Sequence, residues 1–102
     1  MTRRTERIGN LIRNVVAEAI QRRLSDPRIV PLTSVTHVEV AADLSVAHVH
    51  VSVMESEAKQ KLCVLALQNA ARRMRAMLAD RLVARQVPRL DFKLDQSVKE
   101  SF

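Results

Sequence analysis

Residues 47–53 read AHVHVSV, so that small or branched apolar residues alternate with polar ones. A period of two is typical of a β-strand that buries one face. Residues 33–41 are rich in β-branched side chains and predict a second strand. Residues 42–45, ADLS, lie between the two stretches as a turn. The sequence therefore predicts a β-hairpin over residues 33–53.

The register of this hairpin follows from its apolar residues. If Val38 and Val40 share the buried face with Val49 and Val51, an antiparallel pair must place even-numbered residues opposite odd-numbered ones. Val38 is then expected opposite Val49.

A helix is predicted before the hairpin, over residues 5–24. Apolar residues recur there at spacings of three and four, from Ile8 to Leu24, and mark one helical face. Pro27 ends the segment, because proline disfavours helical geometry in the residue before it.

Residues 57–85, after the hairpin, also have a helical pattern. One straight helix of that length would measure about 42 Å. A compact domain of this size has a radius of gyration of only about 13 Å. We therefore predict a bend near residues 69–72.

Leu90, Phe92 and Leu94 alternate again and predict a third strand, which Pro88 opens where a missing N–H is tolerated. The order is helix, strand, strand, bent helix, strand. The last strand must return beside the hairpin after the helical crossover. The fold class is α+β, with one three-stranded sheet and helices on one face, and 102 residues are enough for a single domain.

The charge distribution indicates a polyanionic partner. The formal net charge is +6, and two arginine-rich regions flank an acidic middle. Arginine can donate two parallel hydrogen bonds to a phosphate, which favours nucleic acid. The candidate RNA-binding residues are Arg3, Arg4, Arg7, Arg28, Arg72, Arg73, Arg75, Arg81 and Arg85.

The scarcity of glycine and of aromatic residues excludes further classes of function. Gly9 is the only glycine, which excludes P-loop and dinucleotide fingerprints, and no catalytic site or cofactor is expected. Phe92 and Phe102 are the only Phe, Tyr or Trp residues, so base-stacking platforms are not expected. Phosphate contact and shape recognition of structured RNA remain. A single cysteine, Cys63, and the lack of a long apolar run fit a soluble cytoplasmic protein that uses no membrane.

Three alternatives stay open. His37, His48 and His50, with Glu39, fall on the outward face of the hairpin and could together hold zinc in a metalloenzyme. The first helix could lie on a membrane, although its apolar stripe is better explained as core. The chain could also be a DNA-binding or generic nucleic-acid-binding module.

Short motifs in consistent order resemble bacterial ribosome-binding factor A over almost the whole chain. They are Asp26-Pro27-Arg28, Asp43-Leu44 before Ala47-x-Val49-x-Val51, Met74-Arg75, and Arg85-x-Val87-Pro88-x-Leu90-x-Phe92-x-x-Asp95-x-Ser97.

The resemblance implies a type II KH-like domain over residues 1–102, in the order α-β-β-α(bent)-α-β. We expect flexible ends at about residues 1–4 and 96–102, and a monomer when free. The resemblance also implies binding to the free small (30S) ribosomal subunit and its 16S rRNA. The implied role is late 16S rRNA maturation, including 5′-end processing, and growth in the cold.

One position departs from the family pattern. Family members often have Ala-x-Gly at the helix bend, where this chain has Ala70-Ala71-Arg72. Without the glycine, the bend is expected to be shallower or shifted. In exchange, Arg72 adds a cation there. The Gly-x-x-Gly loop of ordinary KH domains is also missing, so their single-strand grip is not expected.

Overall fold

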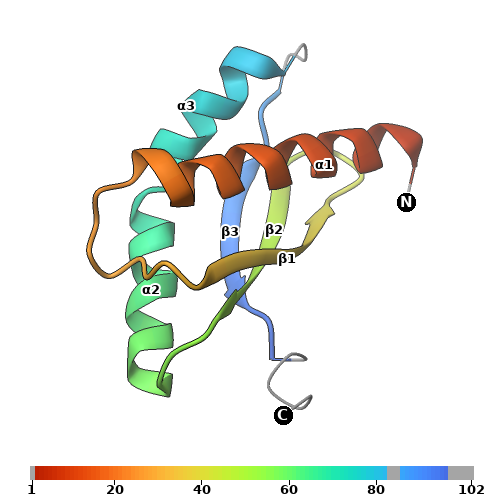
Figure 1. The fold of residues 1–102 in the computed structure, drawn as a ribbon. Helices are drawn as coiled ribbons and strands as arrows, with labels where there is room; N and C mark the ends of the chain where they lie inside the picture. The colour runs from red at the N-terminus through yellow and green to blue at the C-terminus, as the bar shows by residue number, and fades with distance from the viewer. Residues whose placement is uncertain (1, 83–85, 97–102) are drawn as a thin grey trace.

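The computed structural model describes residues 2–82 and 86–96. Figure 1 shows one sheet in this part, with the first helix crossing in front of the strands and the two later helices on the side of the last strand. The elements in chain order are α1 (Arg3–Glu18), the π-helical continuation η1 (Ala19–Arg23), β1 (Thr33–Val40), β2 (Val46–Val53), α2 (Glu57–Asn69), α3 (Ala71–Arg81) and β3 (Arg89–Leu94). The predicted element order and α+β class are confirmed.

The sheet has the order β1-β2-β3. β1 runs antiparallel to β2 with Val38 opposite Val49, as predicted, and β3 runs parallel to β2 with Phe92 opposite Val49. The inward strand residues join buried side chains of the helices in one core, which includes Ile12, Leu67 and Leu78. Burying that apolar face against helices is what holds the layers together.

A β-bulge at Thr36 was not predicted. The register shifts between Val35 and His37. The Thr36 hydroxyl donates to Asp95 Oδ2 at 2.6 Å. The backbone carbonyl of Thr36 accepts a hydrogen bond of 2.9 Å from Arg13 Nη2. The bulge therefore ties β1 both to α1 and to the residue after β3.

α1 begins two residues before the predicted Thr5. The Thr2 side chain accepts from the Thr5 backbone N–H at 3.2 Å, and Thr2 N–H donates to Thr5 Oγ1 at 3.0 Å. This reciprocal capping box stabilises the first turn. Arg3 and Arg4, expected in a flexible end, thus lie in the helix; residues 97–102 fall outside the described residues.

The predicted bend lies at Ala70, between α2 and α3. Ala70 has φ −88° and ψ 0°, which any L-residue can adopt, and its N–H donates to Ala66 O and Leu67 O. This conformation does not require glycine, and the bend lies within the predicted residues 69–72. α3 ends at Arg81, four residues before the predicted Arg85, because Leu82 is extended.

Candidate nucleic-acid interface

The first turn of α3 presents two exposed arginines. Met74 and Leu78 are fully buried and fix the rotation of α3, which leaves Arg72 and Arg73 exposed. Within the described ranges, neither guanidinium has an ion pair or hydrogen bond with another residue. Both are therefore available to phosphates.

A hollow of about 420 Å³ adjoins this turn. It lies between the α2–α3 junction, with Asn69, Ala70 and Arg73, and the segment after η1, with Ser25 and Asp26. Arg73 thus stands near the C-terminal end of the first helical segment, although 50 residues of sequence separate it from that segment's last residue, Arg23.

Three other candidate arginines are engaged within the protein, and two of them lie on α3. Arg75 donates to the Val87 carbonyl from Nε and Nη2, at 3.2 and 2.8 Å, and so joins α3 to the segment before β3. Arg81 Nη2 lies 2.7 Å from Glu18 Oε2 and joins α3 to α1. These two side chains, although exposed, stabilise the packing of α3.

The third, Arg28, is neutralised locally by Asp26. Arg28 Nε and Nη2 donate to the two carboxylate oxygens, at 3.0 and 2.6 Å. This hydrogen bonding, with a further bond from the Arg28 backbone N–H, lowers the pKa of Asp26 from 3.8 to about 2. The Arg28 guanidinium is therefore less available to a further anion than those of Arg72 and Arg73.

The N-terminal candidates form a separate group. Arg3, Arg4 and Arg7 are exposed on the first two turns of α1. α1 and η1 together extend about 30 Å from Arg3 to Arg23, at a rise of about 1.5 Å per residue. The structure therefore places this group and Arg73 at opposite ends of the first helical segment. Arg85 lies outside the described residues.

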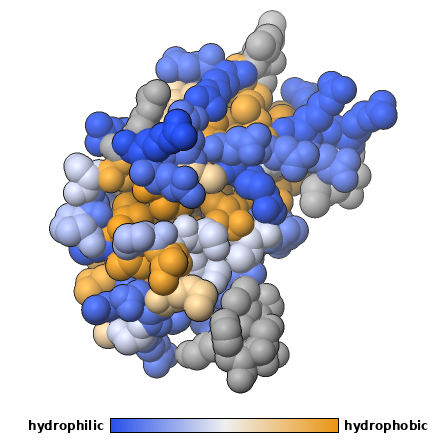
Figure 2. Space-filling model, in the orientation of Figure 1, coloured by the Kyte–Doolittle hydropathy of each residue, from blue (hydrophilic) through white to orange (hydrophobic). Residues whose placement is uncertain are grey.

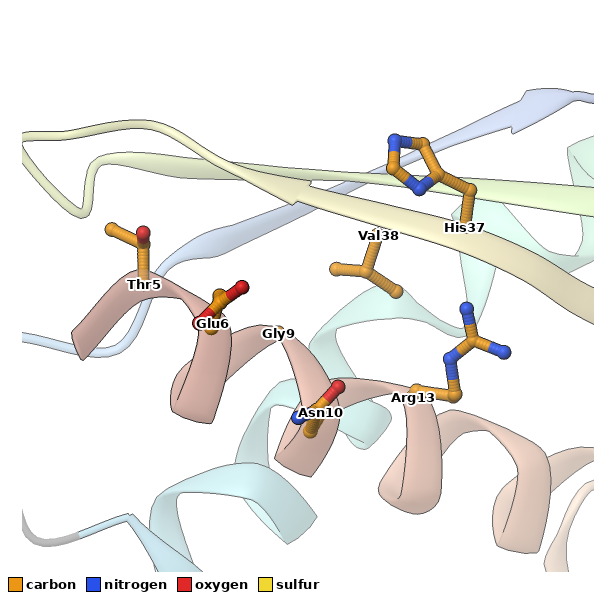
Figure 3. A pocket seen from close by; sticks show the side chains of 7 residues that line it. All are labelled: Thr5, Glu6, Gly9, Asn10, Arg13, His37 and Val38. Atoms are coloured by element: carbon orange, nitrogen blue, oxygen red, sulfur yellow. The ribbon is translucent and has the colours of Figure 1, made fainter. Parts of the chain in front are cut away.

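A smaller hollow lies between parts of α1 and β1 (Figure 3). Thr5, Glu6, Asn10 and Arg13 line it from the helix, and Arg13 points toward the strand. Arg13 is held by the Thr36 carbonyl and Glu6 brings a negative charge, so the hollow does not suit an anion.

The histidines share the sheet face away from the helices, as predicted. The Nε2 atoms of His37 and His50 lie 3.3 and 3.2 Å from Glu39 Oε1, whereas His48 Nδ1 lies 3.0 Å from Asp91 Oδ2. Among the described residues, no group of three His, Cys, Asp or Glu is arranged to hold a metal ion. The metalloenzyme alternative therefore gains no geometric support.

Apolar surface gathers elsewhere. Figure 2 shows hydrophilic side chains along α1 and an apolar area over α2 and the segment that leads into β1. In the part of the chain that the structure describes, the exposed large apolar side chains are Leu32, Met54, Leu62 and Leu65. No helix among the same residues is both long and apolar enough to cross a membrane. Cys63 is buried, with Sγ 3.4 Å from Thr33 Oγ1.

Two residues that contact the edges of the sheet were not predicted from the sequence. Gln68 bonds both to Leu90 O and to Phe92 N, and Arg13 bonds to the bulged β1. Neither residue lies in a motif, and the partners are more than 20 residues away in sequence.

The element order and the three-stranded sheet define a class: a small α+β domain of the type II KH-like kind. Comparison with known proteins gives the family. The family model of ribosome-binding factor A matches residues 4–102. This chain belongs to the ribosome-binding factor A family.

Relatives and solved structures agree. Ribosome-binding factor A of Thermomicrobium roseum is 41% identical over 98 residues, which cover 96% of this chain and 75% of that protein. The crystal structure of the factor from Thermus thermophilus has a TM-score of 0.75 and 34% identity, and covers 88% of this chain and 94% of that one. A Thermus thermophilus homology model, fitted into a cryo-EM map of a 30S complex with this factor, has a TM-score of 0.68 and 35% identity, over 86% and 91% of the two chains.

Proposed function

We propose that this protein is a ribosome-assembly factor that binds the free small (30S) subunit and promotes late maturation of its 16S rRNA. The observation that carries the proposal is the pair of exposed arginines at the α2–α3 junction of a ribosome-binding factor A fold, neither of which has a partner in the described part of the chain. The Thermus thermophilus relative fitted into a 30S complex supports the choice of particle.

The mechanism needs no catalysis by this chain. Arg72 and Arg73 bind phosphates of folded rRNA, and Arg3, Arg4 and Arg7 widen the footprint. The protein then stabilises whichever rRNA conformation fits both groups better, by its differential affinity for the two conformations. This bias favours a late folding step, on which 5′-end processing and growth in the cold depend. Under this proposal the protein is cytoplasmic, is a monomer when free and is not an enzyme.

Binding is tested by co-sedimentation with free small subunits, whole ribosomes and a duplex DNA of equal charge. The proposal expects preference for the free subunit. Equal, salt-dependent affinity for the DNA and the subunit would favour a generic nucleic-acid-binding KH-like module instead.

The role in maturation needs a cellular measurement. In cells depleted of the protein and grown in the cold, primer extension on 16S rRNA should show accumulated 5′-extended precursor. Unchanged precursor levels would contradict this part of the proposal, even if binding to the subunit were found.

A further inference from the structure

The outer edge of β3 is hydrogen-bonded to a side chain, and not to another strand. β3 lies at one edge of the sheet. The backbone N–H groups of Arg89 and Asp95 donate to Ser45 O and Val51 O, so odd-numbered residues turn toward β2. The peptide groups of Leu90 and Phe92 consequently face outward, where an edge strand normally offers unpaired donors and acceptors.

The Gln68 carboxamide forms hydrogen bonds with these outward-facing backbone groups of β3. Its Nε2 donates to Leu90 O at 3.1 Å, and the Phe92 N–H donates to its Oε1 at 2.9 Å. Figure 1 shows how this is possible, because α2 runs beside β3 on the side away from β2. One side chain of α2 therefore stands in for a neighbouring strand at the middle of the β3 edge.

A nucleobase could fill the same position. The Watson–Crick edges of adenine and cytosine place an amino donor beside a ring-nitrogen acceptor, the same pattern as a carboxamide. Single-stranded bases are commonly read through hydrogen bonds to that edge. The Leu90 carbonyl and the Phe92 N–H therefore offer the complementary acceptor and donor to such a base.

The surroundings of Gln68 favour a nucleotide over a peptide strand. Lys61, Leu65 and Gln68 follow one another at spacings of four and three and so share one stripe of α2. Leu65 is 52% exposed and offers apolar area to a base. Lys61 and, at the start of α3, Arg72 are exposed cations that could hold the sugar-phosphate backbone.

We propose that Gln68 is a specificity-determining residue: its carboxamide occupies the place on the β3 edge that a single-stranded base would take. The protein then rejects single strands and is left to bind folded RNA through phosphate contacts. The inference rests on the proposed function only in that RNA is the partner, and its test needs no ribosomal particle.

The test compares Gln68→Ala with the wild type in fluorescence anisotropy, using a short labelled adenylate RNA at low ionic strength. Gln60→Ala is the matched control, because Gln60 lies on the same helix and donates to a strand carbonyl, Val53 O, at 3.1 Å, away from β3. We expect Gln68→Ala to bind the adenylate about tenfold more tightly, as one bidentate base contact permits, and Gln60→Ala to match the wild type.

Two outcomes would overturn the proposal. One is a folded Gln68→Ala protein that binds adenylate no better than the wild type. The other is a Gln68→Ala protein that dimerises without RNA in analytical ultracentrifugation. The glutamine would then prevent β3 from pairing with the β3 edge of a second protein molecule, and not with a base. If alanine unfolds the domain, Gln68→Met fills similar volume without either hydrogen bond and decides the question in the same assay. Failure of the wild type to bind small subunits would sink the proposed function alone.

Discussion

The first turn of α3 and the remainder of this helix both carry arginines, but in different situations. At its start, Arg72 and Arg73 are exposed and have no partner among the described residues. Further along, Arg75 is bonded to the Val87 carbonyl and Arg81 to Glu18. Arg72 and Arg73 can bind a ligand without breaking a contact seen within the described residues. Arg75 and Arg81 would have to leave contacts that hold α3 in place. Exposure alone therefore does not separate the two pairs, whereas an internal partner does.

The largest effect is expected from reversing the charges at the start of the helix. Arg72→Glu combined with Arg73→Glu should lower affinity for free small subunits on the order of 100-fold, because two phosphate contacts become repulsive. Circular dichroism and melting should stay close to wild type, since neither side chain has a partner within the described part of the chain.

The matched control for this variant is Arg89→Glu with Lys93→Glu. Both residues are exposed on β3, and their reversal changes the net charge equally. This control should retain binding to within a few-fold. Equal losses in the two double variants would mean that net charge alone drives binding, and the comparison would then fail.

A smaller effect, on stability, is expected at Arg75. Arg75→Ala removes two hydrogen bonds to Val87 O and should lower the free energy of unfolding by about 1 kcal/mol, as urea titration measures. Arg72→Ala on the same helix should change it by less than about 0.5 kcal/mol. If the two variants were equally stable, the division of α3 into free and engaged arginines would be wrong.

The smallest effect concerns the engaged Arg28 and depends on pH. The pKa of Asp26 is lowered to about 2 in the folded protein, so its pairing with Arg28 stabilises the fold above the unfolded pKa, near 3.8. That stabilisation is lost as the pH falls from about 4 toward about 2. Asp26→Asn and Arg28→Ala should each remove this part of the acid dependence in urea titrations at pH 5 and pH 2.5. A wild-type difference between the two pH values that both variants reproduced would contradict the role of this pair.

The elements were predictable from the sequence because their signals are local. The alternation through Val49 and Val51 sets the hairpin register, and the length of the second helical stretch demands a bend. The bulge at Thr36 had no local signal, and the residue whose carboxylate accepts from the Thr36 hydroxyl, Asp95, lies 59 residues further along. The end of α3 at Arg81 was missed as well, since no glycine or proline follows it directly.

The candidate site was only partly predictable. Sequence composition indicated arginines on α3, but it could not separate Arg73 from Arg81, whose partner Glu18 lies 63 residues away in sequence. Gln68 had no sequence signal at all, because its role exists only where α2 meets the edge of β3. Long-range contacts decide which polar side chains remain free.

The most direct test of the central claim is the salt dependence of binding to free small subunits. The slope of log affinity against log salt concentration reports the number of phosphates neutralised. Arg72→Ala and Arg73→Ala should each reduce the slope by about one, whereas Arg75→Ala should leave it unchanged. Wild-type slopes in Arg72→Ala and Arg73→Ala, or a reduced slope in Arg75→Ala, would contradict the account.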